Sequence, residues 1–297
     1  MTITGRVERE FAQQHMHTIL ARLVGSGAVP RTDQVDAVHA VLQPASRVLV
    51  VQATGWGKSA VYWAATHAIR STGAGPTLVV SPLLALMRDQ VSAAERAGLK
   101  AATVNSTNID DWDEVFERLD QDAMDVLLVS PERLGNPRFA ARLGALLARV
   151  GLIVIDEAHC ISEWGHDFRP SYRKVRDIRA RLGAPPTVAL TATATPEVRK
   201  DIARVLGLRD PEVVLTGFDR PNLRWHVVRT KNDAEKDGTL VSILNDRPGL
   251  AVVYASTRKT VERVASMLTD GELRVVLLGA QAERHASYSE IRALATA

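Results

Sequence analysis

Cysteine is almost missing from this sequence, since Cys160 is the single one among 297 residues. One thiol can form neither an internal disulfide nor a four-cysteine zinc site, so we expect a reducing compartment and no zinc site in this chain. Long apolar runs are missing too, and charges are scattered through the first twenty residues, MTITGRVEREFAQQHMHTIL. The sequence therefore predicts neither a membrane span nor a signal peptide, and we expect a cytoplasmic protein without a membrane partner.

A strong charge of one sign is also lacking. Lys and Arg number 37 against 34 acids, a formal net charge of +3, so charge alone gives weak support for a nucleic-acid partner. Any basic surface must be local. The hydrophobic share of 46% is ample for one large or two medium cores, which excludes a disordered chain.

Short β-branched runs alternate with longer segments of helical spacing from residue 48 onward. The runs are VLVV at 48–51, TLVV at 77–80, AATV at 101–104, DVLLV at 125–129, LIVI at 152–155 and TVAL at 187–190. Apolar runs of four residues are too short for helices and are typical of strands covered on both faces. The alternation predicts an α/β fold, a doubly wound parallel sheet with helices on both faces.

Helical spacing precedes the first strand, over 6–24, and Thr32 is placed to cap the following helix. A second, shorter series has strand-like runs at 223–228, 251–254 and 274–278, with helical patterns at 233–244 and around 261–268. Gly, Pro and Asn separate the two series. We expect an N-terminal helical segment at 1–28, a first domain at 29–216, a linker at 217–224 and a partial second domain at 225–297.

A phosphate-binding loop is indicated where the first strand runs into QATGWGKS, residues 52–59, and then into a helical pattern. Glycines let backbone N–H groups turn toward phosphate oxygens, and the helix N-terminus adds partial positive charge. Lys58 would reach the β and γ phosphates of a nucleoside triphosphate, and the Ser59 hydroxyl would ligate Mg²⁺. The strict pattern has glycine where this chain has Gln52, and a plain turn before a lysine is the alternative. The candidate nucleotide-binding residues here are Thr54, Gly55, Gly57, Lys58 and Ser59.

Two acids, Asp156 and Glu157, directly follow the apolar run 152–155. Their side chains should point to opposite sides of the strand and can take different roles. One acid would hold a Mg²⁺ water while its neighbour would orient the attacking water, as phosphoryl transfer uses such pairs. A solvated pair of loop acids is the alternative, but it is disfavoured by a phosphate loop on another strand of the same sheet.

Aromatic residues are only 5% of the chain, yet three of them, Trp164, Phe168 and Tyr172, recur at intervals of four. His166 and Arg169 lie between them. This mixture suits base stacking beside phosphate contacts. An amphipathic helix that packs its aromatic face into the core is the alternative. Cys160, beside His159, is interpreted as a small core residue rather than a nucleophile.

With these residues identified, the chain resembles a known family. DEAH at 156–159 resembles the box of superfamily 2 helicases, and CISEWGHDFRP at 160–170 resembles the aromatic-rich loop of the RecQ family of DNA helicases. Further motifs that resemble those of the family, in the same order, are SPLLALMRDQ at 81–90, VSPERL at 129–134, TATATP at 191–196, FDRPNL at 218–223 and VYASTR at 253–258. The resemblance extends over about residues 30 to 278.

The resemblance implies a RecA-like ATP-binding domain, part of a second RecA-like lobe, and ATP-dependent 3′ to 5′ movement on single-stranded DNA, or on DNA with a single-stranded tail. DNA repair and recombination are implied in the same way. Arg31 and Gln34 would bind the nucleotide base, with Gln34 reading adenine. The implied catalytic residues are Lys58, Asp156 and Glu157; the DNA contacts are Trp164, His166, Phe168 and Arg169; the residues that couple the two sites are His159, Thr191 and Thr193.

The resemblance ends after Leu278, where the family would continue with motifs V and VI. Motif VI carries an arginine that completes the ATP site, so we expect a truncated or frameshifted member. Two alternatives to a working DNA helicase stay open. One is a catalytically impaired module that binds ATP and DNA. The other is an RNA helicase of the wider DEAH group, which fits the ATP-binding motifs but not the loop at 160–170.

Overall fold

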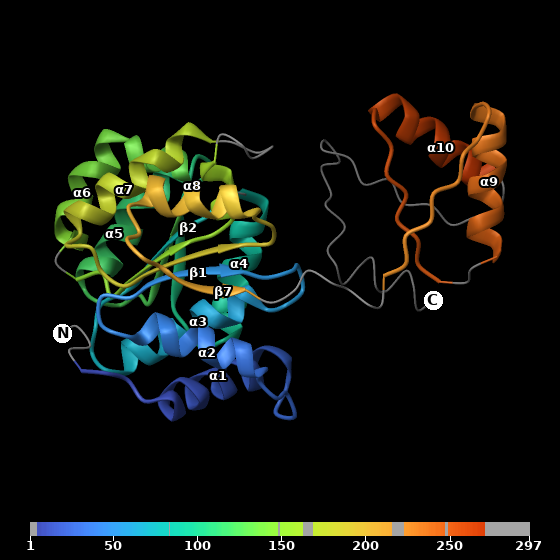
Figure 1. Ribbon diagram of the computed structural model, residues 1–297. Helices are drawn as coiled ribbons and strands as arrows, with labels where there is room; N and C mark the ends of the chain where they lie inside the picture. Colours follow the sequence, from blue (N-terminus) through green and yellow to red (C-terminus); the bar gives the residue numbers. More distant parts are fainter. Residues whose placement is uncertain are drawn as a thin grey trace. The chain divides into compact units, whose positions relative to one another are not determined.

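The chain folds into two compact units, residues 1–219 and 220–297. The computed structural model describes residues 5–82, 84–147, 149–162, 169–215, 223–246 and 249–270. Each unit has its own secondary structure (Figure 1).

The first unit is built on a sheet of seven parallel strands in the order β3-β4-β2-β5-β6-β1-β7 (Figure 1). The strands are β1 (Arg47–Val51), β2 (Thr77–Val80), β3 (Ala101–Val104), β4 (Val126–Val129), β5 (Leu152–Ile155), β6 (Thr187–Thr191) and β7 (Glu212–Leu215). All strands run the same way, so their carboxyl ends meet along one edge, where open α/β sheets bind ligands.

Helices cover both faces of this sheet. They are α1 (Arg9–Val24), α2 (Thr32–Leu42), α3 (Lys58–Ser71), α4 (Leu84–Arg96), α5 (Trp112–Asp120), α6 (Pro137–Leu147), α7 (Arg173–Arg181) and α8 (Pro196–Leu206). The first four share one hydrophobic core and the last four share the other. Alternating strand residues feed the two cores: Val48 and Val50 face the first, and Leu49 and Val51 face the second. The predicted doubly wound parallel sheet is confirmed.

Two local expectations for the first unit differ from the structure. β7 is not among the expected strands; it pairs with β1 at the edge of the sheet, where Val213 is 45% and Leu215 40% exposed, so its short apolar run is not buried on both faces. Thr32 is the first residue of α2 rather than its cap. The cap position belongs to Arg31, whose backbone N–H donates to the Gln34 side chain at 3.0 Å.

The second unit contains α9 (Asp233–Asp246) and α10 (Arg258–Asp270), as the helical patterns predict. The expected strands at 223–228 and 251–254 are wrong, since neither stretch forms a strand in this structure. A β-branched run becomes a strand only through hydrogen bonds to a neighbouring strand, and the described residues of this unit supply none. Trp225 and Tyr254 are more than nine-tenths exposed. The third expected strand, 274–278, lies outside the described residues.

No helix in the described part of the chain combines the length and apolar character that a membrane span needs.

Candidate functional site

The phosphate loop lies between β1 and α3, at the carboxyl edge of the sheet. Gly55 and Gly57 have φ values of 83° and 98°, in the left-handed region that favours glycine. Gly57 also caps α3, and a Cβ added there would lie 2.7 Å from Nε2 of Gln34. The backbone path and the approach of Gln34 therefore both require glycine at position 57. Thr54 is exposed in this loop.

Lys58 is the first residue of α3, and its ammonium group turns back onto the loop. Its Nζ donates to the carbonyl oxygens of Gln52 at 2.9 Å and Ala53 at 3.4 Å. Burial lowers the pKa of Lys58, and Glu157 and Asp156 oppose this shift. The cation is thus held in the loop where phosphate oxygens would bind. Ser59 follows it with an exposed side chain.

The start of α2 is hydrogen-bonded to the phosphate loop. The Arg31 guanidinium donates to the Trp56 carbonyl oxygen at 3.2 Å, and Gln34 Nε2 donates to the same oxygen at 2.8 Å. The Trp56 indole N–H donates to Asp33 at 2.8 Å. Both candidate base-binding residues, Arg31 and Gln34, are therefore next to the loop. Gln34 is buried with both ends of its amide engaged, so it also shapes the loop.

Asp156 directly follows β5 as a buried carboxylate, 9% exposed. The backbone N–H of Glu157 donates to its Oδ1 at 3.0 Å, and Gln90 Nε2 donates to its Oδ2 at 2.7 Å. Burial, followed by the neighbouring charge of Glu157, raises the pKa of Asp156 to about 6. A cation that binds here would relieve both effects.

Glu157 leaves the strand through a left-handed backbone, with φ 47° and ψ 47°. This turn, rather than strand alternation, gives the two acids different surroundings: Asp156 is buried, and the Glu157 side chain is 25% exposed. A non-glycine residue at positive φ costs roughly 1–3 kcal/mol. The cost fits a carboxylate that is kept accessible at the edge of the sheet.

The donor set suits Mg²⁺, which takes oxygen ligands from one or two carboxylates and completes its shell with water and substrate phosphates. Asp156 and the Ser59 hydroxyl are the protein oxygens that would hold it, beside the phosphate loop. Within the described ranges, no three His, Cys, Asp or Glu side chains gather as a metal cluster.

His159 connects the acidic strand end to β6. Its Nδ1 lies 2.9 Å from Thr191 Oγ1 and 3.2 Å from Glu157 Oε2, and its Nε2 lies 3.7 Å from the Cys160 sulfur. Hydrogen bonds to Cys160 first and Glu157 second raise the pKa of His159 to about 10, and burial opposes this shift. Thr191 is buried, and its hydroxyl donates to the Thr193 carbonyl oxygen at 3.1 Å. All three predicted coupling residues are therefore brought together, with Thr193 joined through its backbone.

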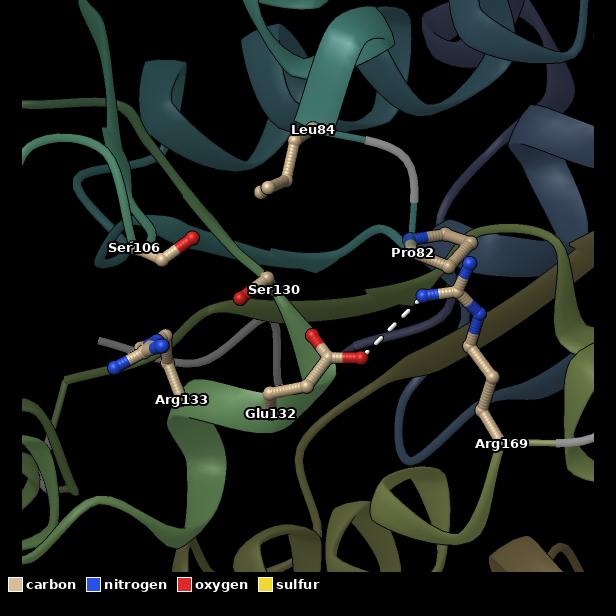
Figure 2. Close-up of a pocket in the computed structure, with 7 residues that line it drawn as sticks. All are labelled: Pro82, Leu84, Ser106, Ser130, Glu132, Arg133 and Arg169. Carbon is tan, nitrogen blue, oxygen red and sulfur yellow. Dashed lines mark hydrogen bonds and ion pairs between the residues drawn. The ribbon is translucent and has the colours of Figure 1, made fainter. Parts of the chain in front are cut away.

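A cavity of about 480 Å³ opens at the other half of the same edge, beyond β2, β4 and β3 (Figure 2). It is lined by Pro82, Leu84, Ser106, Ser130, Glu132, Arg133 and Arg169. Figure 2 shows the Glu132 carboxylate and the Arg169 guanidinium turned toward each other, 3.3 Å apart. Hydroxyl groups and guanidinium groups in an open cavity are suited to phosphate oxygens.

The predicted DNA contacts Trp164, His166 and Phe168 lie outside the described residues. Arg169, which directly follows them, lines the cavity, and its backbone N–H donates to the Cys160 carbonyl oxygen at 2.8 Å. Tyr172 departs from the stacking expectation. It is fully buried, and its hydroxyl donates to the backbone oxygen of Asp156 at 2.9 Å. For Tyr172 the core-packing alternative is correct, because three-dimensional contacts rather than spacing decide which aromatic side chain reaches solvent.

Sequence reasoning gave no role to Gln90, although its side chain binds the Asp156 carboxylate directly. It also gave none to Leu84, Ser106 and Ser130 in the cavity. Gln90 lies within the stretch 81–90 that resembles a helicase motif, and that stretch was the available signal. Its partner is 66 residues away, a separation that no local pattern encodes.

A family model described as DEAD/DEAH box helicase matches residues 31–202, which contain the phosphate loop, the acidic strand end and the cavity. The chain is 39% identical over 249 residues to the ATP-dependent DNA helicase RecQ of Bacillus subtilis, a match that covers 82% of this chain and 40% of that protein. It is 38% identical over 234 residues to the probable ATP-dependent DNA helicase RecS of the same organism, covering 78% of this chain and 45% of that protein. The chain spans less than half the length of these relatives.

A solved structure with a similar fold is that of the DUF1998 helicase MrfA bound to DNA. The TM-score is 0.67 at 17% identity, and the match covers 91% of this chain and 39% of that one. Together with the family match, the likeness confirms the expected RecA-like helicase fold.

Proposed function

We propose that this chain, which belongs to the DEAD/DEAH box helicase family and within it to the RecQ helicases, couples ATP hydrolysis to movement along single-stranded DNA. The observation that carries the proposal is that one edge of one sheet holds two different sites. The phosphate loop and the acids occupy the half over β1, β6 and β5, and the cavity occupies the half over β2, β4 and β3.

The ATP half supports hydrolysis by its chemistry. Lys58 supplies a cation in the loop, Asp156 and Ser59 would hold Mg²⁺, and Glu157 is the partly exposed carboxylate that would orient the attacking water. Bound Mg²⁺ would neutralise charge that develops on the phosphates. Arg31 and Gln34 border the loop on the side of α2, where they would contact the base.

The DNA half supports binding of a strand through its phosphates. Arg133 and Arg169 bring positive charge, and Ser106 and Ser130 bring hydroxyl donors. The relatives RecQ and RecS are named DNA helicases, which favours DNA over RNA. Trp164, His166 and Phe168, immediately before Arg169, are the proposed base-contacting residues. Movement in the 3′ to 5′ direction is proposed from the family resemblance.

The test is ATP turnover by the purified chain at saturating Mg²⁺, with and without single-stranded DNA. We expect turnover that DNA stimulates and that Lys58→Ala abolishes. Binding of both ligands without turnover would instead identify an ATP- and DNA-binding module, the alternative that the sequence leaves open. Stimulation by RNA but not by DNA would overturn the choice of nucleic acid.

The cavity is tested by DNA affinity at several salt concentrations. We expect Arg169→Ala to weaken single-stranded DNA binding by roughly 10-fold and to lower the salt dependence, because one phosphate contact and its released counterion are lost. The matched control is Arg138→Ala, which removes an exposed arginine that pairs with Asp113 outside the cavity. Equal losses in both variants would argue against the cavity as the DNA site.

A further inference from the structure

The two halves of the functional edge meet where β2 lies next to β5. β2 leads into α4, whose first residue, Leu84, lines the cavity. Asp156 directly follows β5, on the ATP side. The strands pair in register from Thr77 with Leu152 to Val80 with Ile155. Any side chain that crosses from α4 to Asp156 therefore joins the cavity to the ATP half.

Gln90 is such a side chain. Its Nε2 donates to Asp156 Oδ2 at 2.7 Å, a short distance for an N–H···O bond, as expected when the acceptor is a carboxylate. The other oxygen, Oδ1, accepts from the Glu157 backbone N–H at 3.0 Å. Each carboxylate oxygen keeps a further lone pair for a metal ion or its water. The two donors together fix the plane of the carboxylate.

Two buried polar groups adjoin this contact, the Tyr62 hydroxyl and Gln90 Oε1. Tyr62 lies on α3 one turn after Ser59. Burial first, and then Asp156, raise the pKa of Tyr62, whereas hydrogen bonds with the Ser59 and Gln90 side chains lower it. The Gln90 amide therefore lies between the Tyr62 hydroxyl and the Asp156 carboxylate, beside the residues that would hold Mg²⁺.

α4 is suited to transmit a displacement between the two sites. Gln90 follows Leu84 by six residues, about 9 Å along a helix, and the fully buried Met87 between them anchors the helix in the core. Because a helix moves largely as a rigid body, a displacement of its N-terminal end moves Gln90 by a similar amount.

We infer that Gln90 is a positioning residue that orients Asp156 for Mg²⁺–nucleotide and links that orientation to occupancy of the cavity. The inference rests on the proposed function. Gln90 acts through Asp156 and does not itself touch the nucleotide. Its amide is required as a donor, so an apolar side chain of the same length cannot replace it.

The experiment compares Gln90→Met and Gln90→Ala with the wild-type chain. Both variants remove the donor, but Met keeps the length of the side chain and Ala does not. The matched control is Ser92→Ala, at an exposed position on the same helix. The first measurement is equilibrium binding of a fluorescent ATP analogue during titration with Mg²⁺. The second is the ratio of ATP turnover with single-stranded DNA to turnover without it.

We expect both Gln90 variants to need roughly 10-fold more Mg²⁺ for half-maximal nucleotide binding, the effect typical when a group that orients a metal ligand is removed. The DNA stimulation ratio should fall in both, and Ser92→Ala should match the wild-type chain. A Mg²⁺ midpoint within about twofold of wild type in both variants would overturn the inference, and so would a shift confined to Ala, which would indicate lost packing.

The outcomes separate this inference from the proposed function. A wild-type chain that binds Mg²⁺–nucleotide but shows no turnover refutes the proposed function, and the Mg²⁺ midpoints of the variants still decide the role of Gln90. A wild-type chain that binds no nucleotide overturns both.

Discussion

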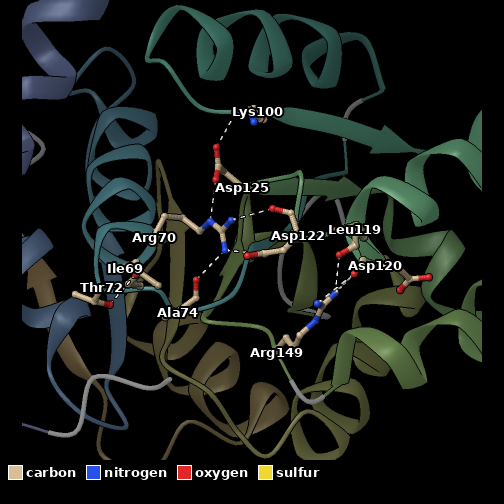
Figure 3. A network of polar contacts seen from close by, with 10 residues as sticks. All are labelled: Ile69, Arg70, Thr72, Ala74, Lys100, Leu119, Asp120, Asp122, Asp125 and Arg149. Atoms are coloured by element: carbon tan, nitrogen blue, oxygen red, sulfur yellow. Dashed lines mark hydrogen bonds and ion pairs between the residues drawn. The ribbon is translucent and has the colours of Figure 1, made fainter.

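The two edges of the central sheet use charged side chains in opposite ways. At the amino-terminal edge, Arg70 at the end of α3 bonds to Asp125 at 2.8 Å, to Asp122 at 2.9 Å and to the Ala74 carbonyl oxygen at 2.8 Å (Figure 3). At the carboxyl edge, the Asp156 carboxylate is also buried, yet within the described residues it has hydrogen bonds and no ion pair.

The polar groups at the amino-terminal edge bind one another. Asp125 also accepts from the Lys100 backbone N–H at 2.8 Å, and Arg149 donates to the Leu119 carbonyl oxygen at 2.6 Å (Figure 3). These bonds join the residues before β3, β4 and β5 to the ends of α3 and α5. Each charge here has a partner within the protein, so removal of one partner would leave the other uncompensated.

At the carboxyl edge, unfavourable electrostatic and backbone interactions remain in the folded protein. The pKa of Asp156 is raised to about 6, the backbone of Glu157 is left-handed, and burial lowers the pKa of Lys58. Unfavourable interactions of this kind cluster at sites where a bound ligand supplies the missing partner. The contrast teaches that the two edges of one sheet can use charged residues for opposite purposes. It predicts that substitutions at the carboxyl edge affect activity and substitutions at the amino-terminal edge affect stability.

The largest effect should come from Glu157→Gln, which keeps the shape of the side chain and removes its charge. We expect DNA-stimulated ATP turnover to fall by roughly 10²–10⁴-fold, because the attacking water loses its oriented base. The free energy of unfolding should change by less than about 1 kcal/mol, since the side chain is partly exposed. Steady-state turnover and urea denaturation measure the two quantities. Asp113→Asn, at an exposed acid of α5, is the control, and a Glu157→Gln variant that retains turnover would remove the distinction between the edges.

The reverse pattern is expected for Arg70→Met. The free energy of unfolding should fall by roughly 2–3 kcal/mol, because the largely buried Asp125 loses its cation, whereas Asp122 is exposed and contributes little. Turnover per folded molecule should stay at the wild-type value. Urea denaturation combined with active-site titration measures both. Arg138→Met, which breaks an exposed pair with Asp113, should cost no more than about 0.5 kcal/mol. Loss of turnover in a fully folded Arg70→Met variant would contradict the assignment.

The smallest effect concerns the helix that covers the first core. His15 on α1 and His67 on α3 have their Nδ1 atoms 2.7 Å apart, and burial, followed by His67, lowers the pKa of His15 to about 4. A histidine whose folded pKa is depressed binds fewer protons when folded, so stability is lost as pH falls below its unfolded pKa of about 6.5.

Between about pH 7.5 and pH 5.5 we expect the free energy of unfolding to drop by about 1 kcal/mol through this residue. His15→Leu should remove that part of the pH dependence, and His17→Leu, at an exposed position of the same helix, should keep it. Urea denaturation at the two pH values measures the difference. An identical pH dependence in His15→Leu and wild type would show that the buried histidine pair does not titrate in this range.

The sequence by itself determined the features that local pattern encodes. Runs of apolar residues specified six of the seven strands, and helical spacing specified the helices between them, because burial on both faces of a parallel sheet demands these periods. Gly57 before Lys58, and the acids after β5, specified the positions at which phosphate and metal binding is proposed, because a left-handed turn and a strand end are themselves local.

Only the tertiary structure decided what depends on contacts between distant segments. It placed β7 beside β1, denied strand pairing to 223–228 and 251–254 among the described residues, and turned Tyr172 into the core. It also brought Gln90 to Asp156. Strand order and side-chain contacts across a sheet are set by packing among elements that lie tens of residues apart. The same local sequence patterns are therefore compatible with several arrangements, and packing of the core selects one of them.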